Sequence, residues 1–198
     1  MTPTLDALRG RLAARRPGSF AFEALAPELL PEGGLRRAAV LVPLFEHEGE
    51  PHVLLTRRRA DLRRHAGQVS FPGGRIEPGE EPLRAALRET EEEVGLDPAR
   101  VEVLGALDET LVLVTGFRLT PWVGVVPYPY PYVAHPAEVE AILYVPISAL
   151  MREGAHRTEE REAYGGRHEV HFYDLPAITI WGATARVLNQ LLALWSAP

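Results

Sequence analysis

The feature that most limits what this chain can fold into is residues 71–96, FPGGRIEPGEEPLRAALRETEEEVGL. Glycines crowd the first half of this stretch, and the second half has the residue pattern of a helix. Pro82 suits the first helical position, where its missing N–H is not needed, and Gly95 tolerates the left-handed conformation in which many helices end. We therefore expect a glycine-rich loop followed by a helix from Pro82 to about Val94.

Three carboxylates are expected to cluster on this helix. The stripe at helical spacing that should be buried is Leu83, Ala86, Leu87, Thr90 and Val94. Glu89, Glu92 and Glu93 project off that stripe together, and like charges this close destabilise a helix by about 0.2–0.5 kcal/mol per pair. An acidic solvated helix is the simpler interpretation. The glycines in front favour a site for Mg²⁺ or Mn²⁺, because carboxylates bind these ions and backbone amides can approach a phosphate on the same ion.

These residues resemble the Nudix box of the Nudix hydrolases. The matching positions are Gly74, Glu80, Arg88, Glu89, Glu92, Glu93, Gly95 and Leu96, at the spacing that the box requires. Thr90 is the one departure, because it occupies a slot for a hydrophobic residue, and it puts local packing rather than chemistry in question. The box covers only residues 74–96, so it implies a reaction class while the substrate has to be inferred from other residues.

The resemblance implies a pyrophosphohydrolase that uses Mg²⁺ or Mn²⁺ to activate a water molecule for attack on a phosphorus atom. We expect Glu89 and Glu93 to be direct metal ligands, and Glu92 to be a third ligand or one bridged by water. Arg88 is expected to orient a box glutamate through a charge-assisted hydrogen bond.

The backbone of Gly73 and Gly74 is expected to complete the metal or phosphate site, with Glu80 supporting the loop. The general base stays open among three groups of carboxylates. These are the box glutamates, then Glu138 and Glu140, and then Glu159, Glu160 and Glu162. The last group falls in a polar segment, residues 152–167, for which a lid and an ordinary mobile hairpin tip are both open.

The residues before the box narrow the substrate. Five arginines and a histidine between 57 and 65 favour either an anion-binding funnel or a solvated charged loop. The spacing of residues 54–74 resembles the element that precedes the box in coenzyme A pyrophosphatases. By that resemblance we expect Arg58 and Arg63 to bind substrate, with His65 either a phosphate contact or a turn cap. Further segments that resemble this subfamily are Glu138-Val139, Val145-Pro146 and Ile180-Trp181-Gly182-Ala183-Thr184.

This resemblance implies hydrolysis of coenzyme A or an acyl-CoA to 4′-phosphopantetheine, or its acyl form, and adenosine 3′,5′-bisphosphate. The alternatives are a Nudix hydrolase of ADP-ribose or another nucleoside diphosphate derivative, and a non-catalytic nucleotide-binding sensor. Residues 104–114 lack the proline typical of ADP-ribose hydrolases and the tyrosine of diadenosine polyphosphate hydrolases. The tyrosines of VPYPYPY, residues 126–132, either stack an adenine or belong to a stiff polyproline-like connector.

Composition agrees with one domain over residues 1–198, of which residues 1–30 are an N-terminal extension. The net charge of −6 argues against nucleic acid as a partner, and no apolar run is long enough to span a membrane. The chain has no cysteine, which excludes disulfides and thiolate sites. We expect a cytoplasmic enzyme with a small-molecule substrate, which could form a homodimer.

The remaining pattern alternates short strands with few helices. The strands expected are residues 38–45, 52–56, 68–71, 101–107, 111–114, 118–126, 137–144 and 168–173. The other helices expected are a short amphipathic one within residues 1–20, a short one from 146, and residues 183–195. Because strands outnumber helices and do not alternate regularly with them, the fold class is α/β with a mixed sheet, and the resemblance implies an α/β/α sandwich.

Overall fold

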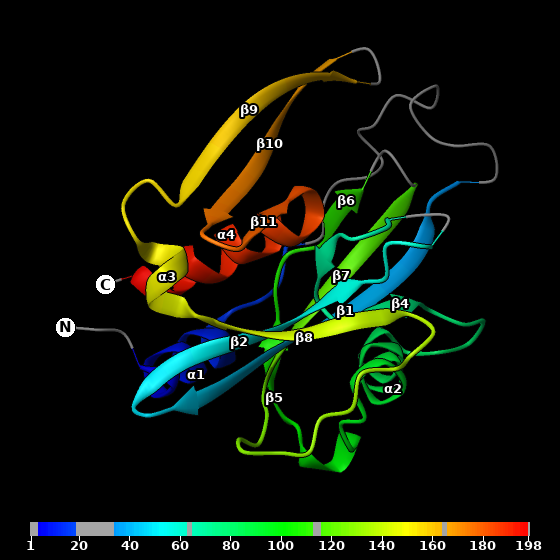
Figure 1. Ribbon diagram of the computed structural model, residues 1–198, viewed down its shortest axis with the longest axis vertical. Helices are drawn as coiled ribbons and strands as arrows, with labels where there is room; N and C mark the ends of the chain where they lie inside the picture. The colour runs from blue at the N-terminus through cyan, green and yellow to red at the C-terminus, as the bar shows by residue number, and fades with distance from the viewer. Residues whose placement is uncertain (1–3, 19–33, 63–64, 113–115, 164–165, 198) are drawn as a thin grey trace.

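The computed structural model describes residues 4–18, 34–62, 65–112, 116–163 and 166–197 of the chain. Its helices are α1 (Leu5–Ala14), α2 (Pro82–Val94), the 3-10 helix η3 (Pro98–Arg100), α3 (Ile147–Met151) and α4 (Gly182–Ser196). Its strands are β1 (Arg36–His47), β2 (Glu50–Arg58), β3 (Val69–Ser70), β4 (Gly73–Arg75), β5 (Glu102–Ala106), β6 (Thr110–Val112), β7 (Phe117–Val125), β8 (Val139–Pro146), β9 (His156–Ala163), β10 (Gly166–Leu175) and β11 (Ile178–Trp181). Figure 1 shows their arrangement.

Within the described residues, strands β1 to β8 form one mixed sheet and β9 to β11 form a second, antiparallel one. β1 runs through the centre of the larger sheet. It pairs in parallel with β7, from Arg36↔Phe117 to Leu44↔Val125, and antiparallel with β2 and β4. The expected α/β architecture with a mixed sheet between helices is therefore confirmed.

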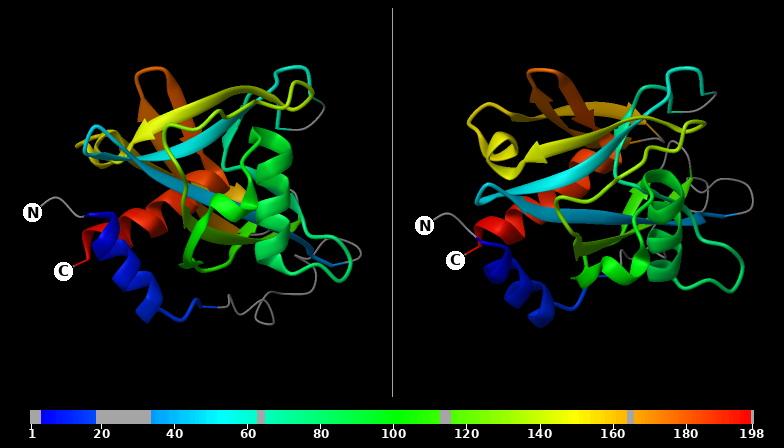
Figure 2. Two further views of the ribbon diagram at one scale, coloured as in Figure 1. Left: turned by 90° about the horizontal axis from the view of Figure 1, so that it is seen from below. Right: turned by 60° about the horizontal axis from the view of Figure 1, so that its bottom comes forward.

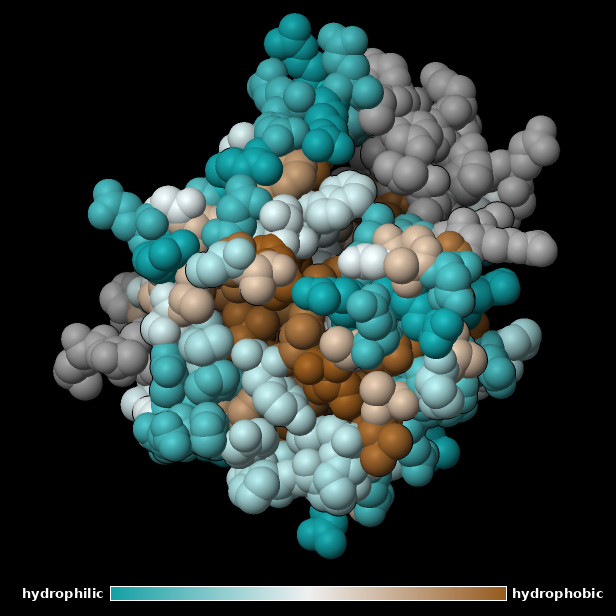
Figure 3. Space-filling view, viewed as in Figure 1, coloured by the Kyte–Doolittle hydropathy of each residue, from teal (hydrophilic) through white to brown (hydrophobic). Residues whose placement is uncertain are grey.

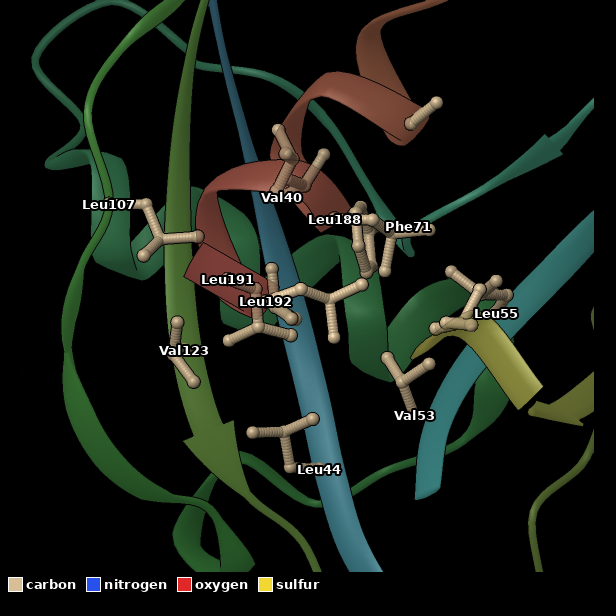
Figure 4. Close-up of a cluster of buried hydrophobic side chains, with 14 of the residues drawn as sticks. Val40, Leu44, Val53, Leu55, Phe71, Leu107, Val123, Leu188, Leu191 and Leu192 are labelled. Carbon is tan, nitrogen blue, oxygen red and sulfur yellow. The ribbon is translucent and has the colours of Figure 1, made fainter. Parts of the chain in front are cut away.

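The two faces of the larger sheet bury separate hydrophobic clusters because side chains alternate along each strand. On one face, α1 and α4 pack over even-numbered residues of β1 such as Val42 and Leu44. Figure 4 shows Leu188, Leu191 and Leu192 of α4 in this cluster. On the other face, Ala85, Ala86 and Val94 of α2 pack over odd-numbered residues of β1. The helix that carries the predicted site, α2, thus packs on one face of the larger sheet.

The helix α2 has the bounds that the sequence predicts. Gly95 ends it with φ +71°, in the left-handed region. Thr90 is buried in the slot for a hydrophobic residue, and its hydroxyl donates to the carbonyl oxygen of Ala86 at 2.6 Å. This hydrogen bond satisfies the only polar atom of the side chain, so threonine fits the buried face.

The two ends of the described chain lie side by side. Leu8 and Leu12 of α1 are buried beside α4, as the amphipathic pattern predicts. Arg11 donates to the carbonyl oxygens of Leu194 and Trp195, at 3.0 and 2.8 Å, which are free at the end of a helix. Figure 2 shows the two helices next to each other from two further sides. None of the described helices is long and apolar enough to cross a membrane.

Residues 152–167 contain a strand that the sequence analysis did not predict. We expected a polar loop there, but β9 pairs with β10 in an antiparallel hairpin from His156↔Tyr173 to Ala163↔Gly166. The prediction missed β9 because its strand face carries charged rather than apolar residues. Figure 3 shows hydrophilic residues covering this hairpin at the top of the view, while hydrophobic residues gather near the centre of the face.

The proline-rich segment between β7 and β8 is a connector that is hydrogen-bonded to the end of α2. The backbone N–H groups of Val133 and His135 donate to the carbonyl oxygens of Val94 and Glu93, at 3.0 and 2.9 Å. Tyr130 accepts a hydrogen bond from the N–H of Asp97 at 3.1 Å. Its neighbours Tyr128 and Tyr132 pack against the α2 side of the sheet, so the connector interpretation describes all three tyrosines.

Candidate active site

The glycine-rich stretch that we expected as a loop in front of α2 begins with a short strand, and only residues 76–81 form a loop. Gly73 and Gly74 lie in β4 and pair with Val40 and Ala39 of β1. Gly73 has φ +149°, and a Cβ built there would be 2.4 Å from the carbonyl oxygen of Ala39. Only glycine allows so close an approach, which is why a glycine-rich stretch that looks like a loop forms a strand.

The two glycines form the seat of two carboxylates. The N–H of Gly73 donates to Oε2 of Glu93 at 3.3 Å. A Cβ at Gly74 would be 2.4 Å from the carboxylate carbon of Glu89. A side chain at Gly74 would push the Glu89 carboxylate away, and one at Gly73 would clash with Ala39 and Val40 of β1. The glycine pair and the acidic helix of the sequence motif therefore meet in space.

The structure corrects the expectation that all three carboxylates project away from the buried face. Glu92 is exposed and Glu89 is half-buried, but Glu93 is only 5% exposed. Glu93 is buried because its side chain points at β4, which covers this part of α2. The three residues therefore occupy different environments. We expect the less exposed carboxylates, Glu89 and Glu93, to interact most strongly with a bound cation.

Burial changes the protonation of these groups. Burial raises the pKa of Glu93 to about 8, against the opposing effects of the Arg58 charge and the Gly73 N–H. Burial likewise raises the pKa of Glu89, which is opposed by its hydrogen bond from Arg88. The nearby carboxylate of Glu138 raises both pKa values further. A place where ionised carboxylates are this unfavourable favours binding of a cation.

Arg88 is the hub of a hydrogen-bond network across the motif. Its Nε donates to Glu80 at 2.9 Å, and its Nη1 donates to Glu89 at 2.9 Å. Its Nη2 also reaches the carbonyl oxygen of Arg75 at 3.2 Å. The hydrogen bond from Arg88 is the main reason that the pKa of Glu80 lies below its usual value. In the same network, Glu80 accepts from the N–H of Glu77 at 2.9 Å, consistent with support of the loop.

Of the three side chains expected to bind substrate, Arg58, Arg63 and His65, two lie in the described structure. Arg58 faces carboxylates, with Nη1 3.6 Å from Glu93 and Nη2 3.7 Å from Glu138. His65 is exposed, has φ +56°, and its Nδ1 lies 2.7 Å from the side-chain Oε1 of Gln68. Arg63 lies outside the described residues. Substrate contacts by all three stay predictions.

The three candidate bases on β9 are paired within their own hairpin. Glu159 forms ion pairs with Arg157 and Arg161, the latter at 2.9 Å, while Glu160 lies 3.4 Å from Arg167. Glu162 lies 3.9 Å from the same Arg167. Each of these glutamates therefore has an arginine of its own hairpin as a partner, whereas Glu138 is close enough to shift the pKa of both Glu89 and Glu93.

The donor chemistry of this site fits a hard divalent cation, although the side chains are not arranged around an ion. Across the described ranges, no group of three His, Asp or Glu side chains is positioned to hold a metal ion as it stands. Glu89 and Glu93 nevertheless supply carboxylate oxygens one helical turn apart, next to the backbone of Gly73 and Gly74. Oxygen ligands of this kind suit Mg²⁺ and Mn²⁺.

Comparison with known proteins identifies the family. Residues 35–164 match the model of the NUDIX domain. The chain belongs to the Nudix hydrolases. It is 40% identical over 172 residues to a protein of Cronobacter sakazakii named an uncharacterized Nudix hydrolase, NudL, with 86% of this chain and 88% of that protein covered. A NudL protein of Escherichia coli is 38% identical over the same share of each chain.

Solved Nudix structures share the fold. The Nudix hydrolase RenU from M. smegmatis has a TM-score of 0.51 and 24% identity, covering 60% of this chain and 74% of its own. A MutT/nudix family protein from Enterococcus faecalis has a TM-score of 0.51 and 16% identity, covering 95% of this chain and 68% of its own. Membership of the Nudix hydrolases makes this chain a pyrophosphatase of nucleotide derivatives, in a family that generally uses divalent metal ions.

Proposed function

We propose that this Nudix hydrolase cleaves coenzyme A or an acyl-CoA to 4′-phosphopantetheine, or its acyl form, and adenosine 3′,5′-bisphosphate, with Mg²⁺ or Mn²⁺ as cofactor. The observation that carries the proposal is the ordered element of residues 54–74, which resembles the one before the box in coenzyme A pyrophosphatases. Its described residues include the end of β2, β3 and the first two residues of β4, which are Gly73 and Gly74.

A second segment of the same resemblance supports the proposal from the far end of the chain. Ile180 and Trp181 belong to β11, and β11 contacts β3 of the first segment. Two stretches more than a hundred residues apart in sequence therefore adjoin in space. Such an association is expected if both serve the same substrate.

The chemistry follows from the carboxylates. Glu89 and Glu93 would hold the divalent ion, with Glu92 as a further or water-bridged ligand. When bound, the ion supplies Lewis-acid polarisation of the phosphate oxygens and a water of lowered pKa. A carboxylate of the cluster accepts the proton of the attacking water, while the bond from the attacked phosphorus to the bridging oxygen breaks. Arg88 holds Glu89 in place through its hydrogen bond.

A comparison of substrates tests this proposal. We expect the highest kcat/KM with coenzyme A among coenzyme A, dephospho-coenzyme A, ADP-ribose and NADH, with 4′-phosphopantetheine among the products. A contact to the 3′-phosphate is worth roughly 1.5–3 kcal/mol, so dephospho-coenzyme A should be at least about tenfold poorer. A chelator should abolish turnover, and Mg²⁺ or Mn²⁺ should restore it. A higher kcat/KM with ADP-ribose or NADH would contradict the proposal.

A further inference from the structure

Arg58 occupies an unusual position for a residue expected to contact substrate. Its Nη1 faces Glu93 at 3.6 Å and its Nη2 faces Glu138 at 3.7 Å, so both ends of the guanidinium fork are directed at carboxylates. Its Nε is buried and has no hydrogen-bond partner among the described residues. The side chain is 25% exposed, which leaves little of the cation turned toward solvent.

The backbone around Arg58 closes into a frame. The N–H of Arg59 donates to the carbonyl oxygen of Glu138 at 3.0 Å, which ties the end of β2 to the segment before β8. The same segment is tied to α2, because His135 donates to the carbonyl oxygen of Glu93 at 2.9 Å. Residues 135–138 are therefore hydrogen-bonded both to the end of β2 and to α2. These three segments carry Arg58, Glu93 and Glu138.

We propose that Arg58 is a positioning residue that clamps Glu93 of α2 and Glu138 of the segment before β8 at a fixed separation. A planar guanidinium holds its donors in a rigid fork and can fix two carboxylates at a set separation, whereas an ammonium is a point charge with rotatable donors. The cation also offsets the repulsion between the carboxylates of Glu93 and Glu138, since it lies close to both. Through Glu93, Arg58 controls the geometry of the hydrolytic site without contacting the substrate.

This role differs from phosphate binding in what it predicts. A clamp acts on every substrate equally, because it works through the carboxylates. A phosphate ligand acts only on substrates that carry the phosphate. The inference rests on the hydrolytic site of the proposed function but not on the choice of coenzyme A, since its first measurement needs no substrate.

The first measurement is thermal unfolding in EDTA of the wild type, Arg58→Gln, Glu138→Gln and the double variant. Removing one partner of a partly buried charge cluster should lower the midpoint of Arg58→Gln by about 5 °C or more. Adding Glu138→Gln to that variant removes one of the uncompensated charges and should recover at least half of the loss. Arg9→Gln, whose side chain pairs with Glu102 on the α1 side, is the control and should change the midpoint by about 1 °C or less.

The second measurement is steady-state kinetics at 10 °C below the midpoint of each variant. With saturating Mg²⁺, Arg58→Gln should lose about tenfold or more in kcat with KM changed less than threefold. The ratio of kcat/KM for coenzyme A to that for dephospho-coenzyme A should stay within twofold of the wild type. Arg58→Lys keeps the charge but not the fork, and should recover stability more fully than kcat; it also carries the test if Arg58→Gln does not fold.

Two results would overturn the clamp. One is a double variant no more stable than Arg58→Gln, which would mean that Arg58 and Glu138 are not coupled. The other is a raised KM with a reduced preference for coenzyme A at unchanged kcat, which would make Arg58 a phosphate ligand. If no tested substrate is hydrolysed, the proposed function fails while the unfolding measurement still decides the clamp.

Discussion

Gly74 lies directly against the carboxylate of Glu89: a Cβ at Gly74 would be 2.4 Å from the carboxylate carbon and from Oε2. Real Cβ atoms do not approach other atoms this closely, so any larger residue at position 74 displaces Glu89. The position of the Glu89 carboxylate on α2 therefore requires a glycine at position 74 of β4.

Gly74→Ala tests this relationship. We expect kcat to fall by about tenfold to a hundredfold, because a displacement of about 1 Å in a catalytic group can cost about a hundredfold. The control is Gly10→Ala in α1, where a Cβ meets nothing within 4 Å. That variant should leave kcat unchanged and raise stability by about 0.5–1 kcal/mol. Unchanged kcat in Gly74→Ala, measured with saturating Mg²⁺, would show that Glu89 is free to move without loss.

Glu93→Gln should abolish most activity while keeping the fold. The amide is close in shape to the carboxylate and can still accept from the N–H of Gly73. We expect kcat to fall about a thousandfold or more, since even outer partners of metal ligands are worth about 10–100-fold. Glu91→Gln, an exposed neighbour on the same helix, is the matched control and should keep full kcat. Activity of Glu93→Gln within tenfold of the wild type would exclude Glu93 as an essential ligand.

The variant Glu93→Gln should also change how the folding stability depends on pH. The pKa of Glu93 is raised by burial from its usual 4.5 to about 8, so the folded state holds this proton over a range where the unfolded state has lost it. Folding stability in EDTA therefore falls as pH rises from about 4.5 to about 8. Gln at position 93 does not titrate, so its advantage in unfolding midpoint over the wild type should grow from pH 5 to pH 9. An advantage that is constant over this range would contradict the raised pKa.

Arg88→Lys tests the hub of the network. Lysine keeps the charge but cannot make the separate hydrogen bonds that Arg88 directs to Glu80, to Glu89 and to the carbonyl oxygen of Arg75. We expect kcat to fall by about 10–100-fold, the range for partners that orient metal ligands. Arg84→Lys, an exposed position one turn earlier on α2, should change kcat less than twofold. Equal kcat for the two variants would remove the orienting role from Arg88.

Sequence alone predicted the bounds of α2 because its signals are local. Pro82 and Gly95 mark its ends whatever surrounds them, and the helical period fixes which residues share a face. β4 was missed because it pairs with a strand far away in sequence, and β9 was missed because its residues are charged rather than apolar. The glycines of β4 become a strand only through β1, and the charged residues of β9 only through β10.

The candidate site likewise has features that the sequence predicts and features that depend on contacts between distant residues. The identity of the carboxylates follows from the sequence motif, but the burial of Glu93 depends on β4 covering α2 from another part of the chain. The pairing of Arg58 with Glu138 joins residues eighty positions apart, and no spacing rule connects them. A charge run such as residues 57–59 gives no sign of which member turns toward carboxylates and which toward solvent.

The last prediction separates Glu138 from the three glutamates of the β9–β10 hairpin as candidate bases. Glu159, Glu160 and Glu162 are each paired with an arginine of the β9–β10 hairpin, so their single Gln variants should keep kcat within about threefold of the wild type. Glu138→Gln should instead lower kcat about tenfold or more, because this carboxylate lies against Arg58 and acts on both buried box glutamates. The measurement is kcat for all four variants at one saturating Mg²⁺ concentration. A large loss in any hairpin variant with full kcat in Glu138→Gln would move the proton-accepting group to the hairpin and require that hairpin to close over the site.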